Sequence, residues 1–514
     1  MAKQRSQRGK RIAIVGAGVS GIAAASVLNR LGHETVLFEK AAEIGGIWAL
    51  GYPGVALQNT RLHYELSQFP WPEEPDLHPT GLQIERYLRR AVQRLSLDVR
   101  TEHEVVRLEE KSAGWTAHVR HQRGEESAFF DFVIPAIGQY TDWKHVPAFE
   151  GQARFRGQII TERDVKDLEV FRGKRTVIVG FGKSAVDMAA AAAELAPEVR
   201  HVFRTPRWMI PHRILGQTYS SVLFCRASTV FMPCWDQPTA AERFLHRRTP
   251  WAVDAFWSAA AAFFRWRCLR HARGAGEGAA RRLQTVLPDH ELVKDLRSAA
   301  AMAPQSYYAH VASGRIRPHR AELAGFVEEG VALVGGEILP CDQVLLCVGS
   351  ETPRFPFLPD EYRKLLEGES DGPQLYRHLI HPDIPHMAFA GYNHGFMHIP
   401  SAEVGTLWLC ALLREEIALP SRQDMLASMD RVREWKRRHI HFEPSRSCAV
   451  NTRFQQYLDV LLKELRVSPY RKLPNVFSEV VGEYGARDYF GVIEEYERRR
   501  TPGSEARAVL PLDT

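Results

Sequence analysis

One short pattern occurs twice in this chain of 514 residues, once at the start and once in mid-chain. In each copy an apolar run, at residues 11–15 or 175–179, leads directly into a glycine-rich turn and then into helix-forming residues. The turns read Gly16-Ala-Gly-Val-Ser-Gly21 and Gly180-Phe-Gly-Lys-Ser-Ala185. A buried strand followed by such a turn and a helix begins a parallel α/β unit whose helix N-terminus binds a pyrophosphate. The repeat therefore predicts an α/β fold with two Rossmann-like dinucleotide-binding domains.

In the first copy each glycine has its own expected use. Gly16 allows the tight turn, Gly18 lets the backbone approach a pyrophosphate, and Gly21 lets the helix pack closely on the strand. A second strand, Glu34–Phe38, ends in Glu39, whose carboxylate can accept hydrogen bonds from both ribose hydroxyls of an adenosine. The alternative is a glycine loop with a purely structural use.

The second copy differs at the end of its second strand. Strand Val199–Phe203 ends in Arg204, at the position that Glu39 holds in the first copy. A guanidinium there suits the 2′-phosphate of NADPH. We expect Lys183 or Thr205 to assist it, and the alternative is that Arg204 is only a solvated residue at a strand end.

Four further motifs follow the first pair of strands. They are Gly45-Gly46-Ile-Trp48, Tyr52-Pro-Gly54, Leu57-Gln-Asn59-Thr60 and Ser67-Gln-Phe-Pro-Trp-Pro72. In this order they resemble the flavin-containing and Baeyer-Villiger monooxygenases, which are class B flavoprotein monooxygenases. The resemblance implies FAD at the first glycine turn and NADPH at the second.

Two more strands ending in glycine, at residues 131–138 and 342–349, resemble the segments that close each half in this family. They divide the chain into an FAD-binding part over residues 1–165, an NADPH-binding domain over 166–345, and a return to the FAD-binding domain over 346–514. Residues 214–300 carry no family motif. This insertion is either a substrate lid or membrane-surface helix, or an amphipathic insertion that packs on the rest of the protein.

The stretch from residue 385 to Glu403 resembles the last segment that contacts FAD in the family, and a helix is expected at 406–414. His394 and His398 have the i, i+4 spacing of metal ligands on a helix. Gly395 and Pro400 predict a loop instead, and no third ligand lies nearby in the sequence. We therefore predict no metal site.

The linker between the two halves departs from the family pattern. Phe155 and Gly157 fit the fingerprint F-x-G-x-x-x-H, whereas Thr161 stands in place of its histidine and Val165 in place of its final ring. Residues 304–320 lack the segment typical of Baeyer-Villiger members and resemble the flavin-containing branch. That branch oxygenates nitrogen and sulfur atoms.

The resemblance implies an NADPH-dependent monooxygenase that inserts one oxygen atom of O2 into a small molecule through a flavin C4a-(hydro)peroxide. N- or S-oxygenation is the expected reaction, and the alternative is Baeyer-Villiger oxidation of a ketone. The amide of Asn59 is the expected catalytic hydrogen-bond donor beside the flavin, unless it only caps a turn. The residues expected to contact a cofactor are Gly16, Gly18, Ser20, Gly21, Glu39, Lys40, Gly46, Trp48, Asn59, Gly138, Gly180, Gly182, Lys183, Ser184, Arg204, Thr205 and Glu403.

Composition limits the other classes of function. The chain has 67 Lys and Arg against 61 Asp and Glu, and a net charge of +6 is too small to indicate a nucleic-acid partner. The longest apolar region, residues 251–264, is interrupted by Asp254 and too short to cross a membrane. No cysteine precedes Cys225 and none forms a C-x-x-C pair, which disfavours a flavin disulfide reductase. The start of the chain has no secretory signal, so we expect a cytoplasmic protein, and a homodimer is compatible with the sequence.

Overall fold

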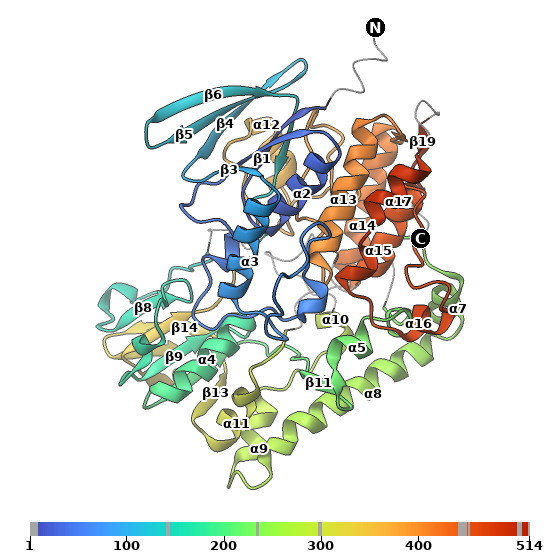
Figure 1. Ribbon diagram of the computed structural model, residues 1–514. Helices are drawn as coiled ribbons and strands as arrows, with labels where there is room; N and C mark the ends of the chain where they lie inside the picture. The colour runs from blue at the N-terminus through green and yellow to red at the C-terminus, as the bar shows by residue number, and fades with distance from the viewer. Residues whose placement is uncertain are drawn as a thin grey trace.

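The computed structural model describes residues 9–139, 144–232, 236–296, 301–439, 450, 453–500 and 506–511. It contains two parallel sheets, and each contains one copy of the repeated pattern (Figure 1). The first sheet has the strand order β3-β2-β1-β7. Its strands and the helix that follows its glycine turn are β1 (Arg11–Val15), β2 (Glu34–Phe38), β3 (Asp98–Arg100), β7 (Phe132–Pro135) and α2 (Val19–Arg30).

The second sheet has the order β13-β10-β9-β17-β8, with every pair parallel. Its elements are β8 (Gln158–Thr161), β9 (Thr176–Val179), α4 (Lys183–Leu195), β10 (Val199–Phe203), α11 (Gln305–Ser313), β13 (Ile316–Arg320) and β17 (Gln343–Leu346). Strand β8 precedes residue 166, the boundary expected from the sequence. The linker itself supplies this edge strand, because residues 158–161 pair in register with 343–346. The second α/β unit of the structure therefore begins before that boundary, whereas the α/β fold class with two such units is confirmed.

Smaller antiparallel sheets lie beside the parallel ones. They consist of β4 (Glu104–Lys111), β5 (Gly114–His121) and β6 (Gly124–Phe130), and of β14 (Leu323–Val327), β15 (Gly330–Leu333) and β16 (Ile338–Pro340). Of the two-stranded pairs, β11 (Arg213–Ile214) with β12 (Gln217–Thr218) is also antiparallel, whereas β18 (Ile417–Ala418) with β19 (Arg507–Ala508) is parallel. Short 3-10 turns are η1 (Gly46–Trp48), η2 (Arg61–His63), η3 (Gln152–Arg154), η4 (Leu168–Phe171), η5 (Arg270–Ala272) and η7 (Ala486–Tyr489).

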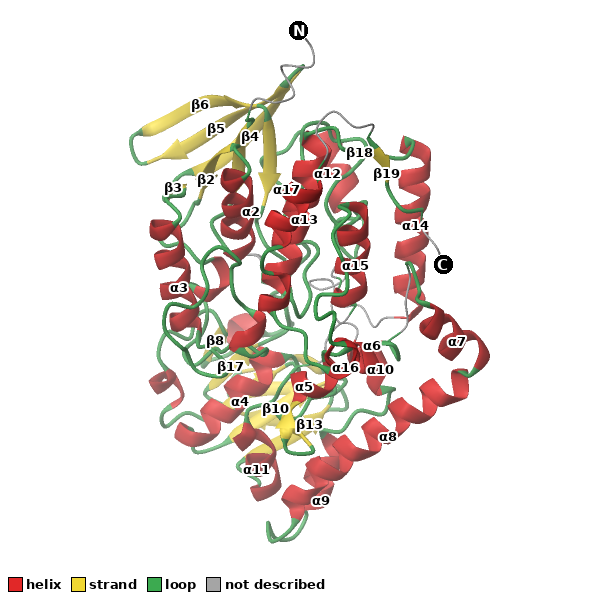
Figure 2. Cartoon of the chain, turned by 45° about the vertical axis from the view of Figure 1, so that its right-hand side comes forward, coloured by secondary structure: helices red, strands yellow, loops and turns green. Residues whose placement is uncertain are grey.

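The insertion is mainly helical. It contains α5 (Tyr219–Leu223), α6 (Arg226–Thr229), α7 (Ala240–Arg248), α8 (Pro250–Leu269), α9 (Ala279–Thr285) and α10 (Leu292–Leu296). Helix α8 runs along the edge of the molecule, from α7 on the side of the C-terminal helices to α9 on the side of the second sheet (Figure 2). No helix among the described residues is both long enough and apolar enough to cross a bilayer.

Packing shows what the insertion does for the fold. Tyr219 and Trp257 belong to the same hydrophobic core as α2, whereas Cys268 and Leu283 belong to the core of the second sheet. Different parts of this helical region are thus buried against different halves of the protein. This packing is in line with the amphipathic insertion among the alternatives left open by the sequence, and the role of a substrate lid or membrane-surface helix stays untested.

The remaining helices are α3 (Gly81–Arg94), α12 (Asp360–Glu367), α13 (His398–Leu413), α14 (Arg422–His439), α15 (Phe454–Glu464), α16 (Val476–Val481) and α17 (Val492–Arg499). Helix α13 is buried over nearly its whole length and packs against α2 and α15. The loop expected around His398 and Pro400 is wrong, because both residues lie in the first turn of α13. Proline is tolerated there since the first N–H groups of a helix have no intrahelical partner.

Candidate functional site

A single cavity of about 1940 Å³ is lined by both glycine turns. Its volume exceeds the roughly 300–1,000 Å³ typical of a pocket for one small ligand. Val15 and Gly16 at the end of β1, and Val179 and Gly180 at the end of β9, face this same space. The carboxyl ends of two parallel sheets therefore open onto one site, as expected where an α/β protein binds two ligands side by side.

The first turn contains glycines of two kinds. Gly16 has a φ of +111°, and a Cβ there would lie 2.7 Å from the Ala136 carbonyl oxygen. A Cβ at Gly21 would lie 2.1 Å from the Gly16 carbonyl oxygen, so these two glycines are needed by the chain itself. Gly18 has an ordinary φ of −75°, and its nearest neighbour would be Gly46 Cα at 3.8 Å. Its lack of a side chain leaves space for a ligand.

The second turn repeats this division. Gly180 has a φ of +117°, and a Cβ there would lie 2.2 Å from the Cys347 carbonyl oxygen. Gly182 has a φ of −80°, and a Cβ there would meet nothing within 4 Å. Helices α2 and α4 begin after Gly18 and Gly182 with no side chain capping their first N–H groups. Both N-termini are therefore available to an anion such as a pyrophosphate.

The residues at the two strand ends have different surroundings. Glu39 is buried, and its carboxylate accepts hydrogen bonds from the backbone N–H of Ala17 at 2.9 Å and of Ala41 at 3.0 Å. The side chain of Arg204 is 77% exposed and pairs with Glu322 at 3.7 Å. Both charged strand ends line the cavity.

Asn59 is buried at the wall of the cavity, and both ends of its amide are held. The hydroxyl of Tyr219 donates to Asn59 Oδ1 at 2.8 Å, and Asn59 Nδ2 donates to the carbonyl oxygen of Phe396. Sequence reasoning missed Tyr219, which lies in the insertion and carries no motif. The contact joins residues 160 positions apart, so no local signal could have found it.

A second polar chain lies at the start of α2. Ser20 Oγ is 2.9 Å from Nε2 of His398, whose Nδ1 is 2.9 Å from Nδ1 of His394. All three residues line the cavity. Burial lowers the pKa of His398 to about 4, so this ring is neutral near pH 7 and relays hydrogen bonds toward the N-terminus of α2. The sequence singled out this histidine pair for its spacing, but not its contact with Ser20.

At the second turn, Lys183 is held by Asp187. Its Nζ donates to Asp187 Oδ1 at 2.6 Å, and the hydroxyl of Tyr52 donates to Oδ2 of the same carboxylate at 2.6 Å. Tyr52 comes from the Tyr-Pro-Gly motif of the first half. The motif therefore joins the first half to the helix that starts the second.

The structure brings most of the predicted cofactor residues together. Those that line the cavity are Gly16, Gly18, Ser20, Glu39, Lys40, Gly46, Trp48, Asn59, Gly138, Gly180, Gly182, Lys183, Ser184, Arg204 and Thr205. Gly21 and Glu403 do not line it. Gly21 permits the packing of α2, and the Glu403 carboxylate accepts hydrogen bonds from Ser67 N and Oγ at 2.9 and 3.0 Å. Burial raises the pKa of Glu403 to about 7.

The two linker residues that depart from the family have structural partners. Thr161 donates from both N and Oγ1 to Asp164 Oδ2, at 2.8 and 2.9 Å, and so closes a turn after β8. Val165 is fully buried in the core of the second sheet. Neither residue lines the cavity.

One group of metal-ligating side chains stands out among the described residues: His103, His121 and Glu126, whose ligand atoms lie within 4.8 Å of one another. His121 Nδ1 accepts the N–H of Arg123 at 3.2 Å, which leaves the ring proton of a neutral His121 on Nε2. The exposed Glu126 lies 3.5 Å from Arg100.

Comparison with known proteins agrees with this geometry. Residues 9–246 match the family described as "Flavin-binding monooxygenase-like". The "Probable flavin-containing monooxygenase 1" of Arabidopsis thaliana is 28% identical, over 93% of this chain and 96% of its own length. The structure of S-allyl-L-cysteine S-oxygenase from Allium sativum superposes with a TM-score of 0.61 at 19% identity, covering 96% of this chain and 99% of that one. Cyclohexanone monooxygenase gives a TM-score of 0.67 at 16% identity, covering 89% and 97%.

Proposed function

The chain belongs to the class B flavoprotein monooxygenases, and on that premise we propose that it transfers one oxygen atom of O2 to a nitrogen or sulfur atom of a small molecule. The cofactors of such an enzyme are FAD and NADPH. The reaction consumes NADPH, a proton, O2 and the substrate, and it yields NADP+, water and the oxygenated substrate. Bound flavin supplies the activation of O2, for which protein side chains alone have no suitable chemistry.

We assign FAD to the first glycine turn and NADPH to the second. The fit rests on Gly18 and Gly182, where neither backbone angle nor neighbouring atoms of the chain require a glycine. A pyrophosphate lying against each turn explains both. Glu39 would accept the ribose hydroxyls of the FAD adenosine, and Arg204 would bind the 2′-phosphate of NADPH.

The residues around the cavity bind, orient and exclude water. The neutral His398 fixes the hydroxyl of Ser20 at the N-terminus of α2, where it can donate to a phosphate. Asp187 holds the Lys183 ammonium at the start of α4, beside the second turn. The buried amide of Asn59 offers a fixed donor to charge that develops on oxygen during transfer.

One observation carries the proposal: two uncapped helix N-termini, each behind a glycine that only a ligand requires, open into one cavity with a fixed amide in its wall. This arrangement allows two dinucleotides to meet where a buried donor is already in place. The cytoplasmic location and the homodimer stay predictions.

Baeyer-Villiger oxidation is the second candidate, favoured by the TM-score of 0.67 with cyclohexanone monooxygenase. The flavin-containing relatives and residues 304–320, which lack the Baeyer-Villiger segment, support N- or S-oxygenation. The two reactions differ in the atom that receives oxygen.

A product panel under 18O2 distinguishes the two reactions. The purified protein is given NADPH and an amine, a sulfide or a ketone, and products are analysed by mass spectrometry. We expect one 18O atom in an N-oxide or sulfoxide and none in an ester. An 18O-labelled ester as the main product would establish the second candidate instead. Protein with the Gly18→Val substitution serves as the control for reactions that need no bound flavin.

A further inference from the structure

We propose that Tyr219 of the insertion is a positioning residue, which holds the amide of Asn59 with one N–H directed into the cavity. The inference rests on the proposed monooxygenase function and extends it by giving the insertion a task at the reaction site. Tyr219 acts through Asn59 and is not itself assigned contact with substrate or cofactor.

The hydrogen bonds around Asn59 define the orientation of its amide. Oδ1 accepts from the hydroxyl of Tyr219 at 2.8 Å, and Nδ2 donates to the carbonyl of Phe396. A flipped amide would set its oxygen against the Phe396 carbonyl oxygen and lose that bond. Burial raises the pKa of Tyr219, so the phenol stays protonated and remains a donor. Of the two amide protons one is bound to Phe396, which leaves the second for the cavity that Asn59 lines.

The ring of Tyr219 is fixed by an aromatic cluster. The side chain is 1% exposed and meets Phe224 edge-on, with ring centroids 5.6 Å apart. Phe224 in turn contacts Phe396 and Phe454, each at 5.1 Å. These rings come from the insertion, from the segment before α13 and from α15. The hydroxyl of Tyr219 therefore points at Asn59 from a rigid base.

A chain of polar contacts returns from the insertion to the residue next to Asn59. Ser221 donates to Glu483 Oε2 at 2.6 Å, and Glu483 Oε1 lies 3.2 Å from His63 Nε2. His63 Nδ1 is 2.9 Å from Thr60 Oγ1. Residues on both sides of the hydrogen bond between Tyr219 and Asn59 are thus tied to the same C-terminal segment.

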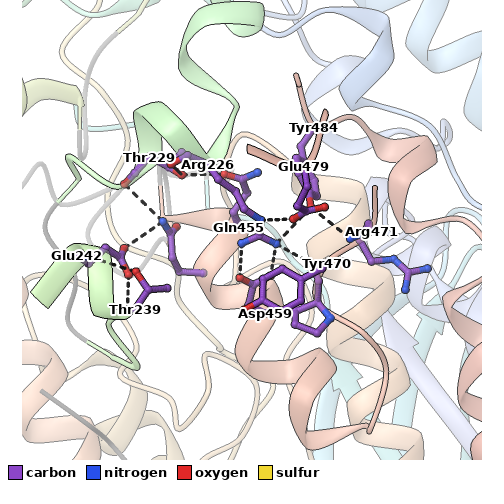
Figure 3. A network of polar contacts seen from close by, with 12 residues as sticks. Arg226, Thr229, Thr239, Glu242, Gln455, Asp459, Tyr470, Arg471, Glu479 and Tyr484 are labelled. Atoms are coloured by element: carbon purple, nitrogen blue, oxygen red, sulfur yellow. Dashed lines mark hydrogen bonds and ion pairs between the residues drawn. The ribbon is translucent and has the colours of Figure 1, made fainter. Parts of the chain in front are cut away.

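The helix after Tyr219 is held by a buried ionic network, drawn in Figure 3. Arg226 donates to both carboxylate oxygens of Asp459, at 2.7 and 3.1 Å, and also pairs with Glu479. Thr229 donates to Gln455 Oε1 at 2.9 Å. Helix α6 is thereby bound to α15 and α16, so the segment that follows Tyr219 is anchored to the C-terminal helices.

If Tyr219 served only in packing, a different result would be expected from the removal of its hydroxyl. Tyr219→Phe keeps the ring and its aromatic contacts and removes only the hydroxyl. If the ring alone matters, this variant behaves as the parent. If the hydroxyl orients Asn59, its removal allows the amide to rotate. The variant then releases more H2O2 for each NADPH that it oxidises.

The experiment compares four proteins: the parent, Tyr219→Phe, Asn59→Leu and the double variant. The H2O2 formed per NADPH oxidised is measured at equal flavin occupancy, together with the FAD dissociation constant and Tm. For Tyr219→Phe we expect a rise in H2O2 yield of about 2- to 10-fold, the range of one lost hydrogen bond, with unchanged FAD affinity. In the Asn59→Leu background the same change should add nothing to the H2O2 yield, because the amide that the hydroxyl orients is gone.

Tyr496→Phe is the matched control. Its hydroxyl donates to Glu416 at 2.6 Å, and its ring is 2% exposed, but neither residue lines the cavity. It should lower Tm and leave the H2O2 yield at the parental value.

Three results overturn the inference. They are an unchanged H2O2 yield in Tyr219→Phe, effects of the two substitutions that add in the double variant, and a Tyr219→Phe protein that unfolds or loses FAD. A parent protein that binds no FAD overturns the proposed function as well. A parent that binds FAD, oxidises NADPH and is indifferent to Tyr219→Phe overturns the positioning role alone.

Discussion

The two glycine turns have nearly the same backbone conformation but very different surroundings. In each, one glycine is forced by a positive φ and a carbonyl oxygen behind it, and another has room for a side chain. At the first turn the strand-end carboxylate of Glu39 is buried and bonded to two backbone amides, whereas at the second turn Arg204 is mostly exposed. The chain's own packing fixes each turn, and we expect the charged residue at each strand end to select the ligand.

The largest effect should come from Gly18→Val. Its β-branched side chain would project into the space in front of α2, where the pyrophosphate of FAD has to lie. We expect protein that folds but is colourless, with FAD affinity reduced about 100-fold or more, measured by flavin absorbance after dialysis. Circular dichroism checks the fold, and a yellow variant with parental affinity would contradict the assignment of FAD to this turn.

Gly182→Val makes the same change at the other turn. Apart from the adjoining residues of the turn and helix, no described residue lies within 4 Å of the added Cβ, so FAD content and Tm should stay near the parental values. The KM for NADPH should rise about 100-fold, because the pyrophosphate at α4 is displaced. Loss of FAD from this variant, with NADPH binding intact, would reverse the assignment of the two cofactors. Steady-state kinetics and flavin absorbance measure both.

Arg204→Ala tests the difference between the two strand ends. A charge-assisted contact to a 2′-phosphate contributes on the order of 1.5 to 3 kcal/mol. Since Arg204 is 77% exposed, we expect the lower end, about a 10-fold loss of NADPH preference over NADH, mainly in KM. Equal use of the two nicotinamides by the parent enzyme would show that Arg204 does not read the phosphate.

The smallest effect should come from Glu322→Gln. Glu322 lies 3.7 Å from Arg204 and lines the same cavity, so it competes for the guanidinium and repels a phosphate. Its removal should lower the KM for NADPH about twofold to fivefold and leave the KM for NADH unchanged, as expected for an exposed pair. A parallel change in both values would indicate a general effect of charge. Paired KM measurements at two salt concentrations distinguish these outcomes.

The elements that are determined by their own local sequence could be predicted. Strands β1, β2 and β10 lie at the expected residues. Strand β1 is a short apolar run before a glycine turn, and β2 and β10 are the apolar runs that follow the helix in each copy of the repeat. The start of α13 was missed, since Pro400 is compatible with the first turn of a helix as well as with a loop. The contact of Tyr219 with Asn59 could not be predicted, because the two residues are distant in the sequence and no motif near either one indicates it. The side-chain contacts at the site were thus visible only in the structure.

The ionic contacts of Arg226 set a rule for recombining this enzyme with its relatives. A chimera whose replacement for residues 214–300 carried no arginine at position 226 would leave Asp459 and Glu479 buried without the guanidinium that pairs with both. Breaking a buried pair in this way costs about 3–5 kcal/mol, a large part of the stability of a typical domain. To keep these ion pairs, residues 214–300 have to be exchanged together with α15 and α16, although these regions lie far apart in the sequence.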